Sequence, residues 1–587
     1  MKVYRIFLLL LVFAALFSAC ELLKPEDDNH SNFDRVYGEP VFAEGLLIRA
    51  YTYIPTNDYR YDEVATDDAV TNNKLSSYLR IATGEWSALY NPQNEWDDCN
   101  RAINYVNLFL TVVDTVQWKW TNDALNALYI RRLKGEAYAL RGMFKYFLLK
   151  HHGGIGTNGQ LLGTPIYNEF LKDEEGFSSP RATFLESVIS AKADFTEALK
   201  YIPLDYGNLG GLEDLPAGFN EISDISHFNT VFGDVSQQRM SGRHVKAFDA
   251  RLDLLAASPA FNEGNNTDLW ITAANSSGEL LDDIGGISGL DPKGNVFYLK
   301  AQVDDADITT GNKKDIAEIL WRRPIYTNRS REQSNFPPSL YGSGTINPTQ
   351  NFVDAFPMAN GYPIEDANSG YNPANPYEGR DPRLALAVVY DGSKLKNTTI
   401  NTGVRVGDDG LDAVQNSTRT GYYLKKLLRE DVNVNPTSTS DQKHFNTHIR
   451  YTEIFLNYAE AANEAWGPGG TGTFGFSAKD VIGAIRNRGG ISQPDEYLAS
   501  IGSKEQMREL IRNERRIELS FESFRFWDLR RWKADLSVPA RGIRIENGNY
   551  SVFTVEERAY DNNYMHYGPI PDKEVVKFNL IQNKGWN

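Results

Sequence analysis

Two features of the sequence have residue types and spacing that could do chemistry: a pair of histidines and an arginine-rich segment. His444 and His448 are four residues apart, which on a helix would place two imidazoles on one face as zinc ligands. No third ligand accompanies them, and Asn446 and Thr447 do not favour a helix, so we interpret both as exposed loop histidines. Acidic loops such as the one from Asp304 could hold calcium, but solvated carboxylates are the favoured interpretation. We therefore predict neither a metal site nor a cofactor.

The arginine-rich segment 511–532 carries the densest charge pattern of the chain, with Phe and Trp residues interleaved. A basic, aromatic helix could bind nucleic acid or sugar, but the acids of this segment stand three residues from its arginines and can pair with them along a helix. The pairs would be Arg515 with Glu518, Glu522 with Arg525, and Arg525 with Asp528. We therefore predict a buried or half-buried ion-pair helix. The net charge of −16 also argues against a nucleic-acid partner, because phosphate binding needs clustered Lys and Arg.

Signatures of catalysis are weak throughout the chain. The sequence contains no G-x-S-x-G and no H-E-x-x-H motif. A glycosidase needs two carboxylates across the scissile bond, and nothing among the 77 acidic residues marks such a pair. The sequence thus identifies no catalytic residue.

The N-terminal residues indicate where the protein works. A positively charged start and a short apolar run lead through small residues to Cys20, the layout of a secretory signal that is removed from the mature chain. In bacterial lipoprotein signals, the cysteine becomes the lipidated first residue. We predict a signal peptide over residues 1–19, lipidation of Cys20 and a polar tether over residues 20–32; the alternative is an ordinary signal peptide with a chance cysteine. If Cys20 carries lipid, Cys99 has no disulfide partner, and the core must hold the chain together.

The sequence predicts helices over much of the rest of the chain. In segment 127–154, apolar residues recur at spacings of three and four, and two glycines end the pattern. The spacing of Ala191, Phe195, Ala198 and Pro203 is that of the second helix of a tetratricopeptide unit, in which small alanines let a neighbouring helix approach. Further helices are predicted over residues 95–114, 242–261, 449–467 and 503–532. We predict a mainly α fold of irregular, tetratricopeptide-like helical pairs.

Long inserts separate these helices. Segments 204–240, 263–315 and 325–445 are rich in Gly, Asn, Asp, Pro and Ser, a composition typical of loops. Short strands are possible over residues 295–303, 383–390 and 421–428. We therefore expect a loop-rich part with minor β structure beside the helical pairs.

Several segments, taken in order, resemble the SusD/RagB family of outer-membrane nutrient-binding lipoproteins. The strongest are "PTQNFVDAFPMANGYPI" from Pro348, "NPYEGRDPRL" from Asn375, "IRYTEIFLNYAEAANEA" from Ile449, "IRNERRIELSFESFRFWDLRRW" from Ile511 and "YGPIPDKEVVKFNLIQNKGW" from Tyr567. Segments of the N-terminal half, such as "GEAYALRGMFKYFLLKHHGGI", match as well. The resemblance spans nearly the whole mature chain. It implies a SusD-like fold with an N-terminal helical region over residues 33–260 and a C-terminal region over residues 261–587, packed as one body.

The resemblance also implies a function. Such proteins are lipid-anchored at the outer face of the outer membrane, bind glycans or sometimes peptides, and act as the lid of a SusC-like TonB-dependent transporter. They are not enzymes. The acidic residues after Cys20, in "KPEDD" from Lys24, resemble the signal that sends such lipoproteins to the outer face. We expect a glycan-binding surface lipoprotein; the alternatives are a secreted glycoside hydrolase and a tetratricopeptide-type scaffold that binds no ligand.

The ligand site should contain aromatic and polar side chains on loops, because a sugar offers apolar C–H faces and hydroxyl rims. The candidates are Trp86, Tyr90, Trp270, Tyr298, Tyr326, Asn328, Arg329 and Tyr341. For each of them, packing against its own loop is the alternative. Trp96 and Trp321 stand in helical and apolar runs, so we expect both to be buried.

Overall fold

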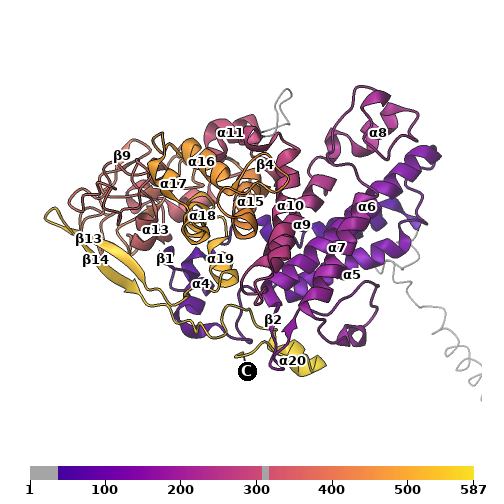
Figure 1. The fold of residues 1–587 in the computed structure, drawn as a ribbon, viewed down its shortest axis with the longest axis horizontal. Helices are drawn as coiled ribbons and strands as arrows, with labels where there is room; N and C mark the ends of the chain where they lie inside the picture. The colour runs from indigo at the N-terminus through magenta and orange to yellow at the C-terminus, as the bar shows by residue number, and fades with distance from the viewer. Residues whose placement is uncertain (1–37, 307–315, 587) are drawn as a thin grey trace, which may run out of the picture.

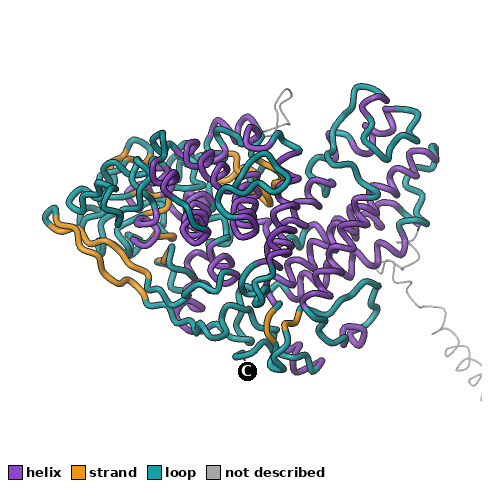
Figure 2. Tube along the Cα trace, viewed as in Figure 1, coloured by secondary structure: helices purple, strands orange, loops and turns teal. Residues whose placement is uncertain are grey.

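The computed structural model describes residues 38–306 and 316–586. The predicted signal peptide, Cys20 and the tether lie outside the described residues. Helices gather on one side of the molecule, and loops with short strands form the other, which confirms the predicted mainly α fold (Figures 1 and 2). No helix within the described ranges is long and apolar enough to span a membrane.

The helical side is built from long antiparallel helices of the N-terminal half. They are α3 (Pro40–Tyr51), α5 (Trp96–Val112), α6 (Asp123–His152), α7 (Phe184–Leu199), α8 (Ile225–Phe232), α9 (Gly242–Ala257) and α10 (Thr267–Asp282). Local signals set their ends: the Asn122 side chain caps α6, and Thr183 with Glu186 forms a capping box on α7. The basic residues Lys150, His151 and His152 close α6, as a helix C-terminus favours.

Helices α6 and α7 form the predicted tetratricopeptide-like pair. Ala191, Phe195 and Ala198 are all buried on α7, as their spacing indicated. On α6, Gly142 faces Phe195 so closely that a Cβ there would lie 2.6 Å from Cε1 of that ring. Gly135, two turns earlier, contacts the end of α7 in the same way. Small residues on one helix and the Phe ring on the other therefore set the close approach of the pair.

The C-terminal half adds helices that pack against this array. They are α11 (Lys300–Asp305), α12 (Ser330–Asn335), α13 (Gln350–Ala355), α14 (Arg383–Ala387), α15 (Tyr451–Trp466), α16 (Ala478–Gly489), α17 (Glu496–Ser500), α18 (Lys504–Glu518), α19 (Arg525–Arg531) and α20 (Asp572–Phe578). Helix α15 lies beside α10, and one hydrophobic core continues from Leu47 to Leu580 across both halves.

The strands form two-stranded antiparallel pairs rather than a large sheet. The pairs are β1 (Ala69–Thr71) with β6 (Ile346–Pro348), β2 (Gly154–Ile155) with β3 (Leu161–Leu162), β4 (Ile319–Arg322) with β12 (Thr447–Arg450), β5 (Tyr326–Asn328) with β11 (Gln442–His444), β7 (Val388–Val389) with β10 (Tyr423–Leu424), β8 (Lys394–Leu395) with β9 (Thr398–Thr399), and β13 (Ala540–Glu546) with β14 (Asn549–Glu556). The prediction of a strand over residues 295–303 is wrong, because this segment forms a turn and then α11. The other two expected strands are reduced to β7 and β10.

The arginine-rich segment is buried as predicted, but its ion pairs are not the predicted ones. The backbone breaks between α18 and α19, where Phe521 and Ser523 have φ angles of 60° and 64°. Because of this break, Glu518 and Glu522 pair with distant segments, whereas Asp528 pairs with Arg515 across the break and with Arg531 along α19. The Glu518 carboxylate lies 2.8 Å from Arg383, and that of Glu522 lies 2.7 Å from Arg450.

The two histidines are likewise not the exposed loop residues that the sequence suggested. His444 ends β11 and His448 lies in β12, and both are buried. Nε2 of His444 is 3.0 Å from Oε1 of Glu332, and Nδ1 of His448 is 2.7 Å from Oγ1 of Thr56. In the described parts of the chain, no group of three or more His, Cys, Asp or Glu is placed to hold a metal. Asp304 instead pairs with Lys300 and Arg429.

We expect Gly142→Ala to lower the free energy of unfolding by about 1–3 kcal/mol, because the new methyl group would overpack against Phe195. Urea unfolding followed by circular dichroism measures the change. Gly45→Ala is the matched control, since Gly45 lies in α3 and nothing is within 4 Å of its added Cβ. That control should gain about 0.5–1 kcal/mol from helix propensity alone. Equal shifts in both variants would contradict the close contact.

Candidate functional site

Three of the aromatic candidates are buried, so the expectation that they form exposed platforms is wrong for them. Trp86 is 3% exposed and packs edge-on against Phe526, Tyr560 and Trp586. Trp270 is 4% exposed on α10, which is a helix and not the expected loop.

Tyr298 is the third of them. It is 5% exposed, and its hydroxyl donates to the carbonyl of Leu386. The physical reason is common to all three: an aromatic ring hides about 150–250 Å² of surface, and neighbouring segments pack over it. Trp96 and Trp321 are buried as predicted.

Three further candidates are accessible but stand apart from one another. Tyr341 is 58% exposed at the end of a short turn. Tyr90 is half-buried, with the Arg80 guanidinium 4.1 Å from its ring centroid. Arg329 forms an ion pair of 2.7 Å with Asp441 on the surface. These residues do not form one site.

Tyr326 and Asn328 are brought together in a surface hollow with a volume of about 610 Å³, here called the Tyr326 hollow. This volume is within the range of about 300–1,000 Å³ that is typical of small-molecule sites. Its lining residues are Asp58, Tyr59, Tyr61, Arg323, Tyr326, Asn328, Ser330, Arg331, Ser334, Asn335, Thr345, Ile346 and Asn446. The walls come from the segment after α3, from β5 and α12, and from the turn between β11 and β12. Figure 1 labels the neighbouring strand β4 where the helical side meets the loop-rich side.

Three half-buried tyrosines give the hollow its aromatic surface. Tyr326 lies nearly parallel to the His444 ring, with centroids 5.9 Å apart. Tyr59 is fixed through its hydroxyl, which is 2.9 Å from Oγ1 of Thr447. The hydroxyl of Tyr61 has no hydrogen-bond partner in the described structure. The hollow therefore has aromatic ring surface beside polar side chains, the combination that an amphipathic ligand needs.

A continuous polar network supports these rings. Nη2 of Arg331 donates to the Tyr326 hydroxyl at 3.1 Å and to Oδ1 of Asn446 at 2.6 Å. Nδ2 of Asn446 donates to Asp58 at 3.2 Å, and Arg323 donates to the same carboxylate at 2.9 Å. Because each member holds the next, the side chains are fixed in place before any ligand arrives.

Burial defines the protonation states in the hollow. It raises the pKa of Tyr59 to about 12, with a contribution from the negative charge of Glu522. Burial also raises the pKa of Tyr61. For Arg331, burial acts to lower the pKa, but the neighbouring phenol groups and Glu332 outweigh it and raise the pKa. At physiological pH the phenols of Tyr59 and Tyr61 are therefore neutral and the Arg331 guanidinium is charged.

Sequence reasoning missed most of this site. Tyr59 and Tyr61 were not candidates, although their alternation in the polar stretch "NDYRYDE" is an aromatic signal of the same kind as the one that identified Tyr326. Arg331 and Asn446 had no local signal, because their role depends on contacts between segments 115 residues apart.

Two other hollows fit a sugar less well. An interior cavity bounded by α6, α9, α15 and α19 has a volume of only about 110 Å³, below the range of ligand sites. A surface hollow of 520 Å³ lies between α5 and α20. There, Asn104 is bonded twice to the backbone of Leu171, and Lys573 pairs with Asp97. These polar side chains of that hollow are thus already engaged with the protein itself.

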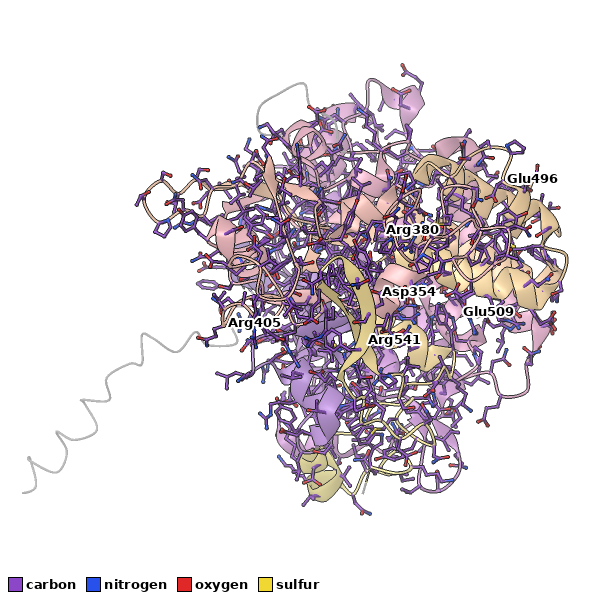
Figure 3. All side chains as sticks on the ribbon, turned by 90° about the vertical axis from the view of Figure 1, so that its left-hand side faces the viewer. Asp354, Arg380, Arg405, Glu496, Glu509 and Arg541 are labelled. Carbon is purple, nitrogen blue, oxygen red and sulfur yellow. The ribbon has the colours of Figure 1, made fainter. Side chains whose placement is uncertain are left out.

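A second group of tyrosines lies at the loop-rich end of the molecule, which Figure 3 views directly. Tyr377 stacks on Tyr390 with centroids 4.4 Å apart, so these rings cover each other. Asp354, Arg380 and Arg541 are close together on this face in Figure 3. Arg541 lies 3.4 Å from Asp354, and Arg380 donates to backbone carbonyls. The Tyr377 and Tyr390 rings and the Asp354–Arg541 pair of this face thus contact each other instead of forming an open platform.

Stacked helical pairs that support a loop-built, tyrosine-lined hollow define the class of the molecule as a mainly helical protein with tetratricopeptide-like pairs beneath a loop-rich face. The family model described as the SusD family matches residues 319–586, and a model described as starch-binding associating with outer membrane matches residues 47–210. The chain belongs to the SusD/RagB family. The search of curated proteins gives no significant match.

Solved structures share the fold over nearly the whole chain. A SusD-like protein from Bacteroides fragilis is 22% identical, with a TM-score of 0.71, over 96% of this chain and 99% of that one. A SusD-like carbohydrate binding protein from the same organism is 19% identical, with a TM-score of 0.66, over 92% and 98%. The surface glycan-binding protein A from Bacteroides fluxus is 16% identical, with a TM-score of 0.56, over 93% and 100%.

We expect Trp86→Ala to cost about 3–5 kcal/mol of unfolding free energy, because the indole fills a buried aromatic cluster. Tyr341→Ala should change the stability by no more than about 0.5 kcal/mol, since this ring is exposed. Urea unfolding of both variants measures the difference. A Trp86→Ala protein with unchanged stability but impaired ligand binding would restore Trp86 as a ligand-binding residue.

Proposed function

We propose that the protein binds a glycan in the Tyr326 hollow at the bacterial cell surface. The observation that carries the proposal is the grouping of Tyr59, Tyr61 and Tyr326 around a pre-arranged polar network. Sugar rings pair their C–H faces with aromatic surface and their hydroxyls with such donors and acceptors. Membership of a family that includes starch-binding proteins, and a fold shared with proteins described as carbohydrate binding, support it.

Binding without cleavage is the form of the function that the hollow favours. Its lining includes a single carboxylate, Asp58, which is engaged by Arg323 and Asn446. Glycoside hydrolysis uses two carboxyl groups across the bond, about 5–10 Å apart. A scaffold that binds no ligand would not require a tyrosine-lined hollow with a pre-arranged network.

A glycan array on the soluble protein, followed by calorimetry with the best ligand, tests the proposal. We expect Tyr326→Ala to weaken binding about tenfold or more, because it removes ring surface and a hydroxyl from the hollow. Tyr341→Ala is the matched control, since Tyr341 is exposed outside the hollow and should leave the affinity unchanged. The glycan is recovered afterwards and its length measured; shortening would identify a hydrolase. Equal binding by both variants would place the glycan elsewhere.

We further propose that the protein is held at the outer face of the outer membrane by lipid on Cys20 and passes the glycan to a SusC-like TonB-dependent transporter. The signal layout before Cys20 and the acidic stretch after it support the anchor and the outer face. The family model described as associating with outer membrane supports the location. Delivery to a transporter rests on the family resemblance, and its test is copurification of a TonB-dependent barrel, identified by mass spectrometry, from detergent-solubilised membranes.

Cys20→Ala should release the protein from membranes, because Cys20 is the residue to which the lipid would be attached. Fractionation of cells into membrane and soluble material measures the release. A second variant in which Glu26, Asp27 and Asp28 are neutralised should stay in the membrane fraction but be protected from protease added to whole cells. Retention of the Cys20→Ala variant on membranes would contradict the anchor.

A further inference from the structure

The guanidinium of Arg331 lies in the wall of the Tyr326 hollow without a carboxylate partner. Among the residues that the structure describes, no Asp or Glu oxygen is within the 4.0 Å that defines an ion pair. Arg331 donates to the Leu427 carbonyl, to the Tyr326 hydroxyl and to Oδ1 of Asn446. A guanidinium carries five N–H groups, so these three bonds leave two without an acceptor.

The neighbouring acids do not pair with Arg331. Asp58 forms an ion pair of 2.9 Å with Arg323, and the two cancel each other. Glu332, the acid next to Arg331 in the chain, is fully buried and is 3.0 Å from His444. Its Oε1 also accepts the backbone N–H of Arg429. Glu332 adds negative charge near Arg331 without forming an ion pair with it, so Arg331 is the cation of the hollow that has no ion-pair partner among the described residues.

The surroundings hold this charge in place. The guanidinium carbon of Arg331 is 5.2 Å from the centroid of the Tyr59 ring, a cation–π contact that covers one side. The Tyr326 hydroxyl and Asn446 fix its Nη2 edge. An arginine fixed in this way has a preset direction for its remaining N–H groups, which suits the oxygens of a carboxylate or sulfate. A partly buried cation without a counter-ion is costly, and an anionic ligand group removes that cost.

We propose that the glycan bound in the Tyr326 hollow is acidic and that its anionic group, a uronic-acid carboxylate or a sulfate ester, binds to Arg331. This inference rests on the proposed glycan-binding function and names the ligand class for the same site. The tyrosines contact the sugar ring, and Arg331 selects the rings that carry negative charge. Neutral glycans would offer only hydroxyl oxygens to the two free N–H groups of Arg331, and these form weaker hydrogen bonds with a guanidinium than a carboxylate or sulfate does.

Two matched pairs of polysaccharides test the ligand class on the unmodified protein. The first pair is polygalacturonate and its carboxyl-reduced form; the second is a sulfated galactan and its desulfated form. We expect one of the charged polymers to bind about tenfold or more tightly than its neutral form, with an affinity that falls as salt is raised. The pair that shows the difference distinguishes a carboxylate from a sulfate. Equal binding within both pairs overturns the inference.

Variants of Arg331 test whether this residue causes the preference for the charged polymer. Arg331→Gln should reduce the affinity for the charged polymer about tenfold or more, while Arg331→Lys should retain part of it because the charge remains. Arg329→Gln is the matched control: Arg329 is close in sequence but is paired with Asp441 outside the hollow, so the affinity should not change. Circular dichroism verifies that each variant is folded, and the comparison of polymers on the unmodified protein stands even if Arg331→Gln does not fold.

The outcomes separate this inference from the proposed function. If the protein binds a neutral glycan, and Tyr326→Ala abolishes that binding while Arg331→Gln does not affect it, the glycan-binding function holds and the acidic ligand class is wrong. If no glycan of the array or of the two pairs binds, the proposed function itself fails. Binding of a charged polymer that is insensitive to Arg331→Gln also overturns the assignment of the anion to this residue.

Discussion

Buried ion pairs between arginines and carboxylates join the segments of the C-terminal half to one another. Helices α18 and α19 are their centre: Arg383 contacts Glu514 and Glu518 at 2.8 Å, and Arg450 contacts Glu522 at 2.7 Å. Buried charges are expensive to desolvate, so such pairs contribute less to net stability than to the choice of a single arrangement. Removal of one partner would leave its counterpart unpaired in the interior, and each pair therefore holds two distant segments in one relative position.

The same ion pairs set the walls of the Tyr326 hollow. Arg450 ends β12, four residues after Asn446, and its ion pair to Glu522 fixes that side. On the other side, Asp67 and Asp68 follow Tyr59 and Tyr61 in the chain and pair with Arg516 and Arg525 on α18 and α19. The segments that contain Asp58 and Asn446 thus both pack against the break between α18 and α19. Asn446 can therefore donate to Asp58, although the two are 388 residues apart in the sequence. The hollow is a consequence of the core beneath it.

The sequence predicted the elements whose signal is local. The helices followed from apolar spacing and caps, and the contact of Phe195 with α6 followed from a tetratricopeptide-like pattern. The prediction of strands failed over residues 295–303, because a short apolar run does not distinguish a strand from a buried turn and helix. It failed in the same way for the arginine-rich segment, where spacing of three residues suggested pairs along a helix that the chain interrupts at Phe521 and Ser523.

By itself, the sequence determined a mainly helical protein of the SusD/RagB family with a buried ion-pair segment and with Tyr326 and Asn328 among its ligand candidates. Only the tertiary structure decided that Trp86, Trp270 and Tyr298 are core residues and that Tyr59, Tyr61 and Arg331 complete the hollow. The physical reason is that helix formation depends on neighbours three or four residues away, whereas the exposure of a loop side chain depends on which distant segment covers it. An aromatic residue in a polar loop has the same local sequence whether it meets solvent or another ring, and long-range packing selects between the two.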